Sequence, residues 1–472
     1  MNIRSIRRIT ADSNHNAFTG AIWFKGALYV AFRQGDAHVC NNGKLVVMRS
    51  RDEGVHFDIV AVLRGDHDTR DAHLFSDGQR LFATGFEYDT RKAQAVSQGA
   101  AWTENGVNWS PWTRFTGTAN LVLWRPRYFK GRYYCAGYGY PNDKRDGTSL
   151  VDWFESGDGL NWKKIRTLRE GPDQPNECAL DFKPDGTAAI LMRRGHASHR
   201  PLLLIAHPPY EKWLETELDI PLLGPALWFV DDDIWIAGRW FLGNNIAHLA
   251  IFKIKKGQPS LQVVLPSGPG TDCSYMGVAR HPDNPRRFAF SYYSGHVAPD
   301  DPTVDQWTHP DIYLADIAFE PCFIESWKVS ELQSIRLQDA YEPDPNNSRF
   351  KWSDFNRLET DLKQVGFVDA HEMIANRPGI MYFVANFDVG PCDSGDLFLG
   401  YDGPVAAWVN GTKVFEGPGD NPATPDKTKI SLDRKSLKPG LNRLAIALDT
   451  NQGKAWGIFA RYEPAQTEYP EA

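Results

Sequence analysis

The sequence predicts an all-β protein: a six-bladed β-propeller followed by a C-terminal β-sandwich. Three observations predict this fold, namely a repeated pair of apolar runs, a turn motif that recurs in register with it, and a composition rich in turn-forming and aromatic residues. Of the 472 residues, 40 are glycine, 31 are proline and 12% are aromatic. A chain of this length exceeds one ordinary hydrophobic core, so we expect two domains or one large repeat array.

The first repeat is a pair of apolar runs joined by a short turn that contains Gly, Asp or Pro. Each copy has the pattern of a β-hairpin. The six copies span residues 18–33, 71–86, 123–138, 178–194, 224–240 and 274–294. Their turns recur at intervals of 47 to 55 residues. A period near 50 residues with about four strands per unit is typical of propeller blades, because one small sheet cannot bury both of its faces alone.

The second repeat is a turn motif at 50–57, 103–109 and 156–162, with starts 53 residues apart. In each copy a Ser or Thr and an Asp or Asn are expected to cap a tight turn. Glycine should take a left-handed conformation there, and the final aromatic residue should pack beneath the blade. These segments resemble the Asp-box, or BNR repeat, of sialidase-type propellers. Such boxes lie far from the active face, so they indicate fold and not function.

The repeats end after Ile317, and a different organisation follows. We expect the propeller to span 1–318. Residues 319–352 have a mixed pattern with a cluster of Pro, Asp and Asn, which predicts a linker. Further apolar runs in 353–472 predict a β-sandwich of the jelly-roll or galactose-binding kind.

Two aromatic residues of the predicted sandwich suggest what this domain does. Trp408 and Trp456 could bind a sugar together with nearby polar groups. The alternative is a packing or oligomerisation module without a sugar site. Within the same domain, Asn410-Gly411 predicts a two-residue hairpin turn.

Charge and hydropathy exclude several classes of partner. The formal net charge is −7 and no basic stripe is present, so we expect no nucleic-acid partner. No apolar run approaches the roughly 18 residues that cross a bilayer, so we expect no membrane span. The N-terminal stretch is basic but lacks the apolar segment of a signal peptide. This predicts a cytoplasmic protein, or a secreted or periplasmic one if a leader has been removed.

The cysteines are six scattered residues with neither a CxxC motif nor metal-type spacing. This pattern predicts free thiols in a reducing compartment, with a single disulfide as the alternative. We expect neither a bound metal ion nor a cofactor. The oligomeric state is left open.

The candidate site follows from the geometry of a propeller, in which the first strand of each blade lines the central channel. Residues that open first strands and close second strands should therefore converge at one mouth of the channel. A packed core does not select the polar types found at these positions. The candidates are His15, Arg33, His38, Asp68, Arg70, Asp71, Arg125, Glu177, Arg194, Arg239, Tyr275 and Tyr292. They predict a polar, anion-binding site, or else a structural network of ion pairs.

At these residues, 10–318 resembles the sialidase superfamily. The resemblance implies a glycoside hydrolase in which a Glu activates a nucleophilic Tyr, an Asp is the acid/base and three arginines clamp an anionic sugar. Tyr275 matches the nucleophile and Glu177 matches the activating residue. Asp68 is the best match for the acid/base, with Asp71 and Asp66 as rivals.

The arginine clamp departs from the family pattern in blade one. Arg194 and Arg239 resemble the second and third clamp arginines, but His15 and the residues after it stand where the first would be. Arg33 or Arg70 could replace that arginine from a neighbouring strand end.

The histidines of blade one support a different chemistry on the same propeller. His15 and His38, beside Arg33, resemble the histidine-centred sites of uronate polysaccharide lyases and of a rhamnosyl-glucuronate hydrolase. In a lyase, a His or Tyr abstracts the C5 proton of a uronate while Arg or His neutralises the carboxylate.

Three functional hypotheses therefore stand. The leading one is an exo-glycosidase that removes a terminal acidic or deoxy sugar from an oligosaccharide or glycan, with Tyr275 and Glu177 as its central pair. The second is the uronate lyase or hydrolase centred on His15. The third is a propeller that binds sugar without turning it over.

Overall fold

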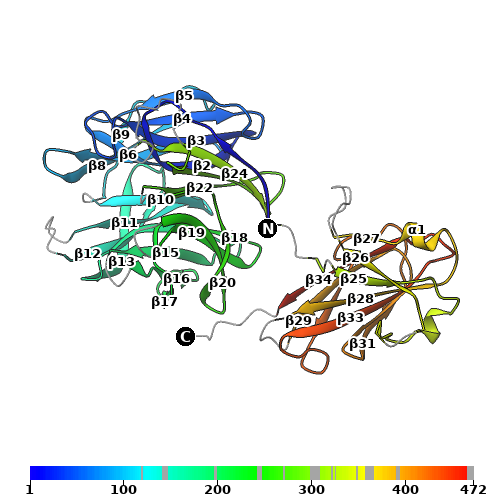
Figure 1. Cartoon of the computed structure of the whole chain (residues 1–472). Helices are drawn as coiled ribbons and strands as arrows, with labels where there is room; N and C mark the ends of the chain where they lie inside the picture. Colours follow the sequence, from blue (N-terminus) through cyan, green and yellow to red (C-terminus); the bar gives the residue numbers. More distant parts are fainter. Residues whose placement is uncertain are drawn as a thin grey trace. The chain divides into compact units, whose positions relative to one another are not determined.

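The computed structural model divides the chain into two compact units, Met1–Glu320 and Pro321–Ala472, which we describe separately (Figure 1). The residues described are 1–118, 121–140, 147–195, 199–241, 247–268, 272–297, 309–319, 323–324, 326–346, 349–356, 366–389 and 394–464. No helix in these ranges is long and apolar enough to cross a membrane.

The described part of unit 1 forms six four-stranded antiparallel sheets, as the repeats predict. The first three sheets consist of β2 (His15–Phe24), β3 (Ala27–Gly35), β4 (Lys44–Ser50) and β5 (Asp58–Leu63); β6 (Asp68–Ser76), β7 (Leu81–Asp89), β8 (Gln94–Thr103) and β9 (Thr113–Arg114); and β10 (Val122–Phe129), β11 (Arg132–Gly139), β12 (Ser149–Ser156) and β13 (Trp162–Gly171). The next two consist of β14 (Pro175–Phe182), β15 (Ala188–Arg194), β16 (Leu202–Ala206) and β17 (Leu214–Glu217); and β18 (Leu222–Val230), β19 (Asp233–Phe241), β20 (Ala247–Lys255) and β21 (Gln258–Val264). Each predicted hairpin forms the first two strands of its sheet.

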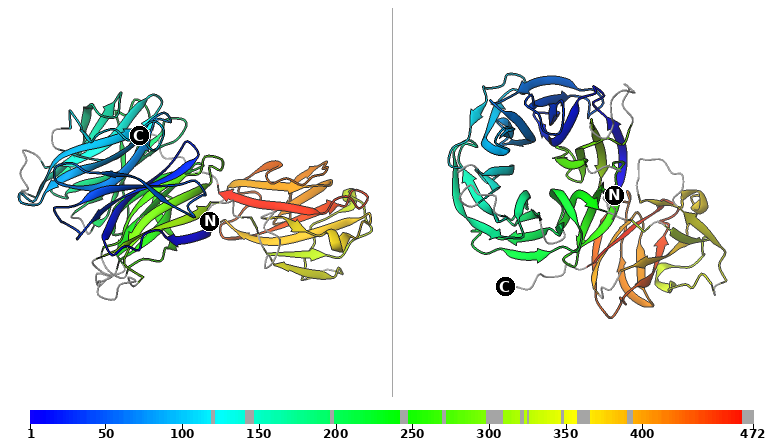
Figure 2. Two further views of the ribbon diagram at one scale, coloured as in Figure 1. Left: turned by 90° about the horizontal axis from the view of Figure 1, so that it is seen from above. Right: turned by 60° about the vertical axis from the view of Figure 1, so that its left-hand side comes forward.

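The sixth sheet closes the ring with a strand from the other end of the propeller. It contains β22 (Ser274–Arg280), β23 (Arg287–Ser294), β24 (Asp311–Ala318) and, as its outermost strand, β1 (Asn2–Arg8). Figure 2 shows the six sheets arranged in a ring around a central axis. Apolar faces of successive sheets pack together, so that Phe24 and Tyr29 of the first blade share a core with Leu74 and Leu81 of the second.

The innermost strand of every blade carries a β-bulge near its start. The register shifts between Ala17 and Gly20 in β2, and the same shift occurs in β6, β10, β14, β18 and β22. In five of the six strands the first bulge residue has a positive φ between 48° and 59°: Phe18, Asp71, Arg125, Gly224 and Tyr275. A bulge redirects the side chains of its strand, and such bulges commonly lie next to active sites. The six bulges therefore lie at the mouth of the central channel, where most of the candidate residues are found.

The three predicted turn motifs connect the third and fourth strands of the first three blades. In the first, the Ser50 hydroxyl accepts from the Gly54 amide at 2.8 Å and Asp52 Oδ1 accepts from the His56 amide at 2.9 Å. Thr103 and Ser156 cap the second and third turns in the same way. The glycines at 54, 106 and 159 all have positive φ, from 76° to 85°. The turn chemistry expected from the sequence is confirmed.

Unit 2 is a sandwich of two sheets, and both contribute to one apolar core. Among the described residues, the larger sheet has the order β26 (Trp352–Asn356), β25 (Ser326–Ser330), β28 (Ile380–Asp388), β33 (Leu441–Asp449), β30 (Val405–Val409) and β31 (Thr412–Gly417). The smaller has the order β27 (Val368–Asp369), β34 (Gly457–Pro464), β29 (Gly395–Tyr401) and β32 (Thr428–Leu432). The described residues of this unit also form the short helices η3 (Leu337–Asp339) and α1 (His371–Ile374).

The structure corrects two expectations for this unit. The predicted linker is wrong, because residues 326–330 form β25, which pairs with β26 on one side and β28 on the other. Trp408 is only 7% exposed and packs in a second core cluster, so it is not available to stack on a sugar. Trp456 is 46% exposed and its ring lies 4.3 Å from that of His371.

Candidate functional site

The centre of the candidate site is a tyrosine hydrogen-bonded to a glutamate from another blade. Tyr275 lies in the β22 bulge and Glu177 in the β14 bulge. The Tyr275 hydroxyl donates to Glu177 Oε1 at 2.8 Å, and Glu177 Oε2 is buried with no hydrogen-bond partner among the described residues. Glu177 Oε1 accepts the hydrogen bond from the phenol and can therefore take the phenolic proton, while Oε2 remains unpaired among the described residues.

An arginine lies against this pair. Arg193, opposite the bulge on β15, donates from Nη1 to Glu177 Oε1 at 2.6 Å and to the Tyr275 hydroxyl at 3.2 Å. Burial opposes ionisation of its guanidinium, but the nearby Glu177 and Tyr275 raise the pKa of Arg193, so it stays charged. A fixed cation beside the phenolic oxygen stabilises the negative charge that develops when the proton leaves.

The tyrosine is neutral until a reaction starts. Burial, together with the negative charge of Glu177, raises the pKa of Tyr275 above its ordinary value. A phenol with a raised pKa is a weak nucleophile unless a base takes its proton as it attacks. Glu177 is in contact with the phenolic oxygen and meets this need.

Asp71 is the carboxyl group with the environment of an acid. It lies in the β6 bulge and is buried. Burial raises the pKa of Asp71 from its ordinary value of 3.8 to about 7, with Glu177 adding to the rise and Arg70 opposing it. A carboxyl with this pKa can both give and take a proton near neutral pH.

Further cations surround the tyrosine and the two carboxyl groups. The Arg239 guanidinium lies 5.5 Å from the centre of the Tyr275 ring, and its Nη2 donates to the Tyr293 hydroxyl at 3.1 Å. Arg125 donates to the Met276 carbonyl, and its Nε and Nη2 are buried without partners in the described part of the chain. Burial and the nearby Arg127 lower the pKa of Arg125 to about 9.

Arg70 adds a cation beside Asp71. Its guanidinium lies 5.1 Å from the centre of the Phe18 ring and 3.8 Å from the nearest oxygen of Asp68. The site therefore contains more arginines than ionised carboxylates, which favours an anionic ligand.

The predicted acid/base and one predicted clamp arginine instead bind each other. Asp68 and Arg33 are completely buried and form a two-point ion pair, with distances of 2.9 Å from Nε to Oδ1 and 3.1 Å from Nη2 to Oδ2. Arg33 also donates to the Ala37 carbonyl at 2.9 Å. A buried pair of this kind fixes the loop after β3 and engages both carboxylate oxygens of Asp68.

Two other predicted residues point away from the tyrosine, and in each case the adjacent residue points toward it. Arg194 binds Asp173, Glu217 and the Arg200 carbonyl. Tyr292 donates to the Pro266 carbonyl at 3.0 Å and stacks on Tyr313. Because neighbouring side chains of a strand face opposite sides, Arg193 and Tyr293 occupy the positions that the sequence assigned to Arg194 and Tyr292.

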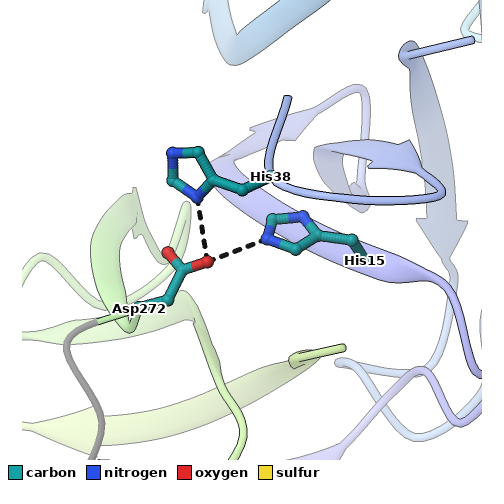
Figure 3. A group of neighbouring side chains, drawn as sticks. All are labelled: His15, His38 and Asp272. Atoms are coloured by element: carbon teal, nitrogen blue, oxygen red, sulfur yellow. Dashed lines mark hydrogen bonds and ion pairs between the residues drawn. The ribbon is translucent and has the colours of Figure 1, made fainter. Parts of the chain in front are cut away.

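The two candidate histidines meet at one carboxylate, Asp272 (Figure 3). His15 Nε2 lies 2.8 Å and His38 Nδ1 lies 2.9 Å from Asp272 Oδ2, and the Tyr293 hydroxyl donates to Oδ1 at 2.8 Å. Burial lowers the pKa of His15, against the opposing effect of Asp272. The His15 side chain is 1% exposed and that of His38 is 51% exposed, so His38 is the histidine that a ligand can reach.

Phe18 connects the histidines to the tyrosine. Its ring lies edge-on to His38 at 5.3 Å and to Tyr275 at 5.1 Å between centroids. Asp272 and Phe18 were not predicted from the sequence. Phe18 begins the first copy of the hairpin repeat, so that repeat could have indicated it, but Asp272 lies just before β22 and no repeat indicates it.

No protein-family model matches the sequence, and no curated protein matches it. Among solved structures, the chain is similar to the endosialidase of phage phi92, with 10% identity and a TM-score of 0.53 over 78% of this chain and 77% of that one. It is also similar to an α-L-arabinanase of Penicillium chrysogenum complexed with arabinobiose, with 13% identity and a TM-score of 0.50 over 67% of this chain and 99% of that one.

Fold and site together define the class of the molecule. It is a six-bladed propeller whose fold is similar to that of an endosialidase and of an arabinanase, and a polar, arginine-rich site lies where its inner strands begin. The resemblance expected from the sequence is confirmed at the level of the fold.

Proposed function

We propose that this protein is a retaining glycoside hydrolase that removes a terminal acidic or deoxy sugar from a glycan, with Tyr275 as nucleophile. The contact between the Tyr275 hydroxyl and Glu177 Oε1 carries this proposal. Two solved structures of similar fold are an endosialidase and an arabinanase, and this likeness supports the proposal that the chain acts on carbohydrate.

The proposed reaction has two steps. In the first, the Tyr275 oxygen attacks the anomeric carbon as its proton passes to Glu177, and Asp71 protonates the leaving glycosidic oxygen. In the second, water attacks the same carbon as ionised Asp71 takes its proton, the bond between that carbon and the Tyr275 oxygen breaks, and Glu177 returns its proton to that oxygen. Two displacements at one carbon retain the configuration.

The arginines support an acidic sugar as the substrate. Arg193, Arg239, Arg125 and Arg70 outnumber the ionised Glu177 in this part of the site, so an anionic substrate relieves the excess positive charge. A neutral tyrosine avoids the repulsion that a carboxylate nucleophile would exert on such a substrate. The clamp that we propose uses Arg193 and Arg239, with Arg70 beside Asp71.

The test is a turnover screen of the purified full chain. The substrates are aryl sialosides, fucosides and rhamnosides together with uronate-containing oligosaccharides, with released aryl alcohol, reducing ends and ultraviolet absorbance as readouts. We expect release of aryl alcohol that falls by about 100-fold or more in Tyr275→Phe and in Glu177→Gln. Tyr292→Phe is the matched control, since in the described part of the chain its hydroxyl donates to the Pro266 carbonyl and not to Glu177.

Two outcomes would overturn this assignment. An unsaturated product, which absorbs in the ultraviolet and persists in Tyr275→Phe but not in His38→Ala, would establish a uronate lyase centred on the histidines. Glycan binding without turnover, with equal affinity in Tyr275→Phe and the wild type, would establish a sugar-binding propeller.

A further inference from the structure

The three ligand-type side chains at the junction of blades one and six form a compact group. His15 opens β2, His38 follows β3 and Asp272 precedes β22, so the group forms only when the two blades meet (Figure 3). Its three ligand atoms lie within 4.8 Å of one another. This grouping is independent of the tyrosine mechanism, which makes no use of Asp272.

The donor set suits a particular class of metal ion. Two imidazole nitrogens and one carboxylate oxygen are the donors of open three-residue sites for zinc and other first-row transition metals. Calcium and magnesium prefer oxygen donors alone. We propose that His15, His38 and Asp272 bind a divalent transition-metal ion of the zinc type, with the remaining coordination positions open to water or to a substrate oxygen.

The distances are close to those of a metal site. Zinc bound at about 2.0–2.1 Å from each donor in tetrahedral geometry separates its ligand atoms by about 3.3–3.4 Å. Here Asp272 Oδ2 lies 2.8 Å from His15 Nε2 and 2.9 Å from His38 Nδ1. An opening of about half an ångström at each contact admits the ion. The side chains of Asp272 and His38 are 20% and 51% exposed, so small rotations of both can supply this opening while the buried His15 stays in place.

The surroundings orient the carboxylate for one-point ligation. The Tyr293 hydroxyl donates to Asp272 Oδ1, and Arg239 in turn donates to that hydroxyl. Oδ2 is therefore the oxygen that faces the two imidazoles. Such outer hydrogen bonds commonly hold metal-binding carboxylates in place. Arg33, a cation near His15, is neutralised by Asp68 and therefore repels an incoming metal ion only weakly.

Metal titration of the full chain tests the proposal. The protein is first treated with a chelator and dialysed, and Zn²⁺ binding is then measured by calorimetry. We expect one equivalent bound with micromolar or tighter affinity. Affinity should fall about 100-fold or more in His38→Ala and in Asp272→Asn, and about tenfold in Tyr293→Phe.

The chain offers a matched control. His56 Nδ1 lies 2.6 Å from Asp52 Oδ2, but both side chains are exposed and no second histidine shares that carboxylate in the described structure. His56→Ala should leave Zn²⁺ affinity unchanged. Equal affinity in the wild type and Asp272→Asn, or loss of binding in His56→Ala alone, would overturn the proposal.

A spectroscopic readout covers the case in which a variant of the buried His15 loses its fold. Co²⁺ is added to wild type and to His38→Ala, a substitution at a half-exposed side chain, and folding of both is checked by circular dichroism. We expect visible absorption from Co²⁺ in the wild type that His38→Ala abolishes. Identical Co²⁺ spectra in the two folded proteins would refute the site, whatever the enzymatic activity.

Discussion

Asp71 is the residue whose protonation should set the pH range of the proposed activity. Its pKa is raised to about 7, so the protonated acid is present below that pH and is lost as the pH rises through it. We expect kcat/KM to fall on the alkaline side with an apparent pKa near 7. This decrease should be absent from the residual activity of Asp71→Asn. Asp66→Asn is the control and should keep the decrease unchanged, because the Asp66 carboxylate is exposed and paired with Arg114.

The same raised pKa has a consequence for stability. Because the folded protein holds Asp71 protonated more tightly than the unfolded chain does, its contribution is complete below the unfolded pKa of about 4 and is lost as the pH rises to about 7. The charged groups that act on Asp71 are Arg70, Glu177, His38 and Arg33. Urea unfolding across this range should show a smaller loss of stability in Asp71→Asn than in the wild type. An equal loss in both would contradict the assignment.

Arg193 and Arg194 are adjacent residues of one type with different surroundings. Arg193→Lys removes the planar group that bridges Glu177 and Tyr275, and charged hydrogen bonds of this kind contribute about 1.5–3 kcal/mol. We expect kcat/KM to fall by about 10- to 100-fold while the unfolding temperature stays nearly unchanged. Arg194→Lys, which weakens contacts to Asp173 and Glu217, should show the reverse pattern.

At the scale of the element, the bulges of the inner strands orient the side chains of the site, and a substitution at Gly224 tests this role. Its φ is 59°, and a Cβ there would lie 3.1 Å from the ring carbons Cδ2 and Cε2 of Tyr275. Gly224→Ala should therefore displace the tyrosine and lower kcat by about 10- to 100-fold. Gly257→Ala is the control, because Gly257 also has a positive φ of 73° but no atom within 4 Å of the added Cβ. Both variants should lose about 1–2 kcal/mol of stability, and a similar kcat for both would contradict the expectation.

The inner hairpins could be predicted from the sequence, but the bulges could not. A hairpin leaves a clear pattern of apolar runs and turn residues, whereas a bulge inserts one residue and changes which side the next residues face. The second strands β15 and β23 each carry two adjacent residues of one type at or near their ends, and the sequence does not show which of the two faces the channel. It therefore indicates the correct strand ends but favours Arg194 and Tyr292 over Arg193 and Tyr293. The sequence favours Asp68 over Asp71 because the buried contact between Asp68 and Arg33 joins two blades and leaves no local signal.

Strand β25 could not be predicted from the sequence either. Its five residues are too few for a clear alternation, and its partner β28 lies about 50 residues further along the chain. Pairing over such a separation depends on the complete sandwich, so the segment alone has the composition of a linker.

At the scale of the whole molecule, the site exists only because the ring closes. Tyr275 and its partner Glu177 belong to blades six and four, while Asp71 belongs to blade two. Blade six, which carries the tyrosine, takes its outermost strand from the N-terminal segment β1. Ring closure and catalysis should therefore fail together.

Deletion of residues 2–8 tests this coupling. Without β1, the edge of β24 loses its antiparallel partner, and the ion pair between Arg8 and Asp311 is lost. We expect the unfolding temperature to fall by about 5 °C or more and turnover to fall in proportion to the loss of folded protein. Arg8→Ala, which removes the ion pair but leaves the strand, should have a much smaller effect. A synthetic peptide of residues 1–10 should partly restore the unfolding temperature and the turnover when it is added to the truncated protein. The unpaired edge of β24 in that protein is a template for the missing strand. An unfolding temperature equal to that of the full chain would show that the other strands hold the ring closed without β1.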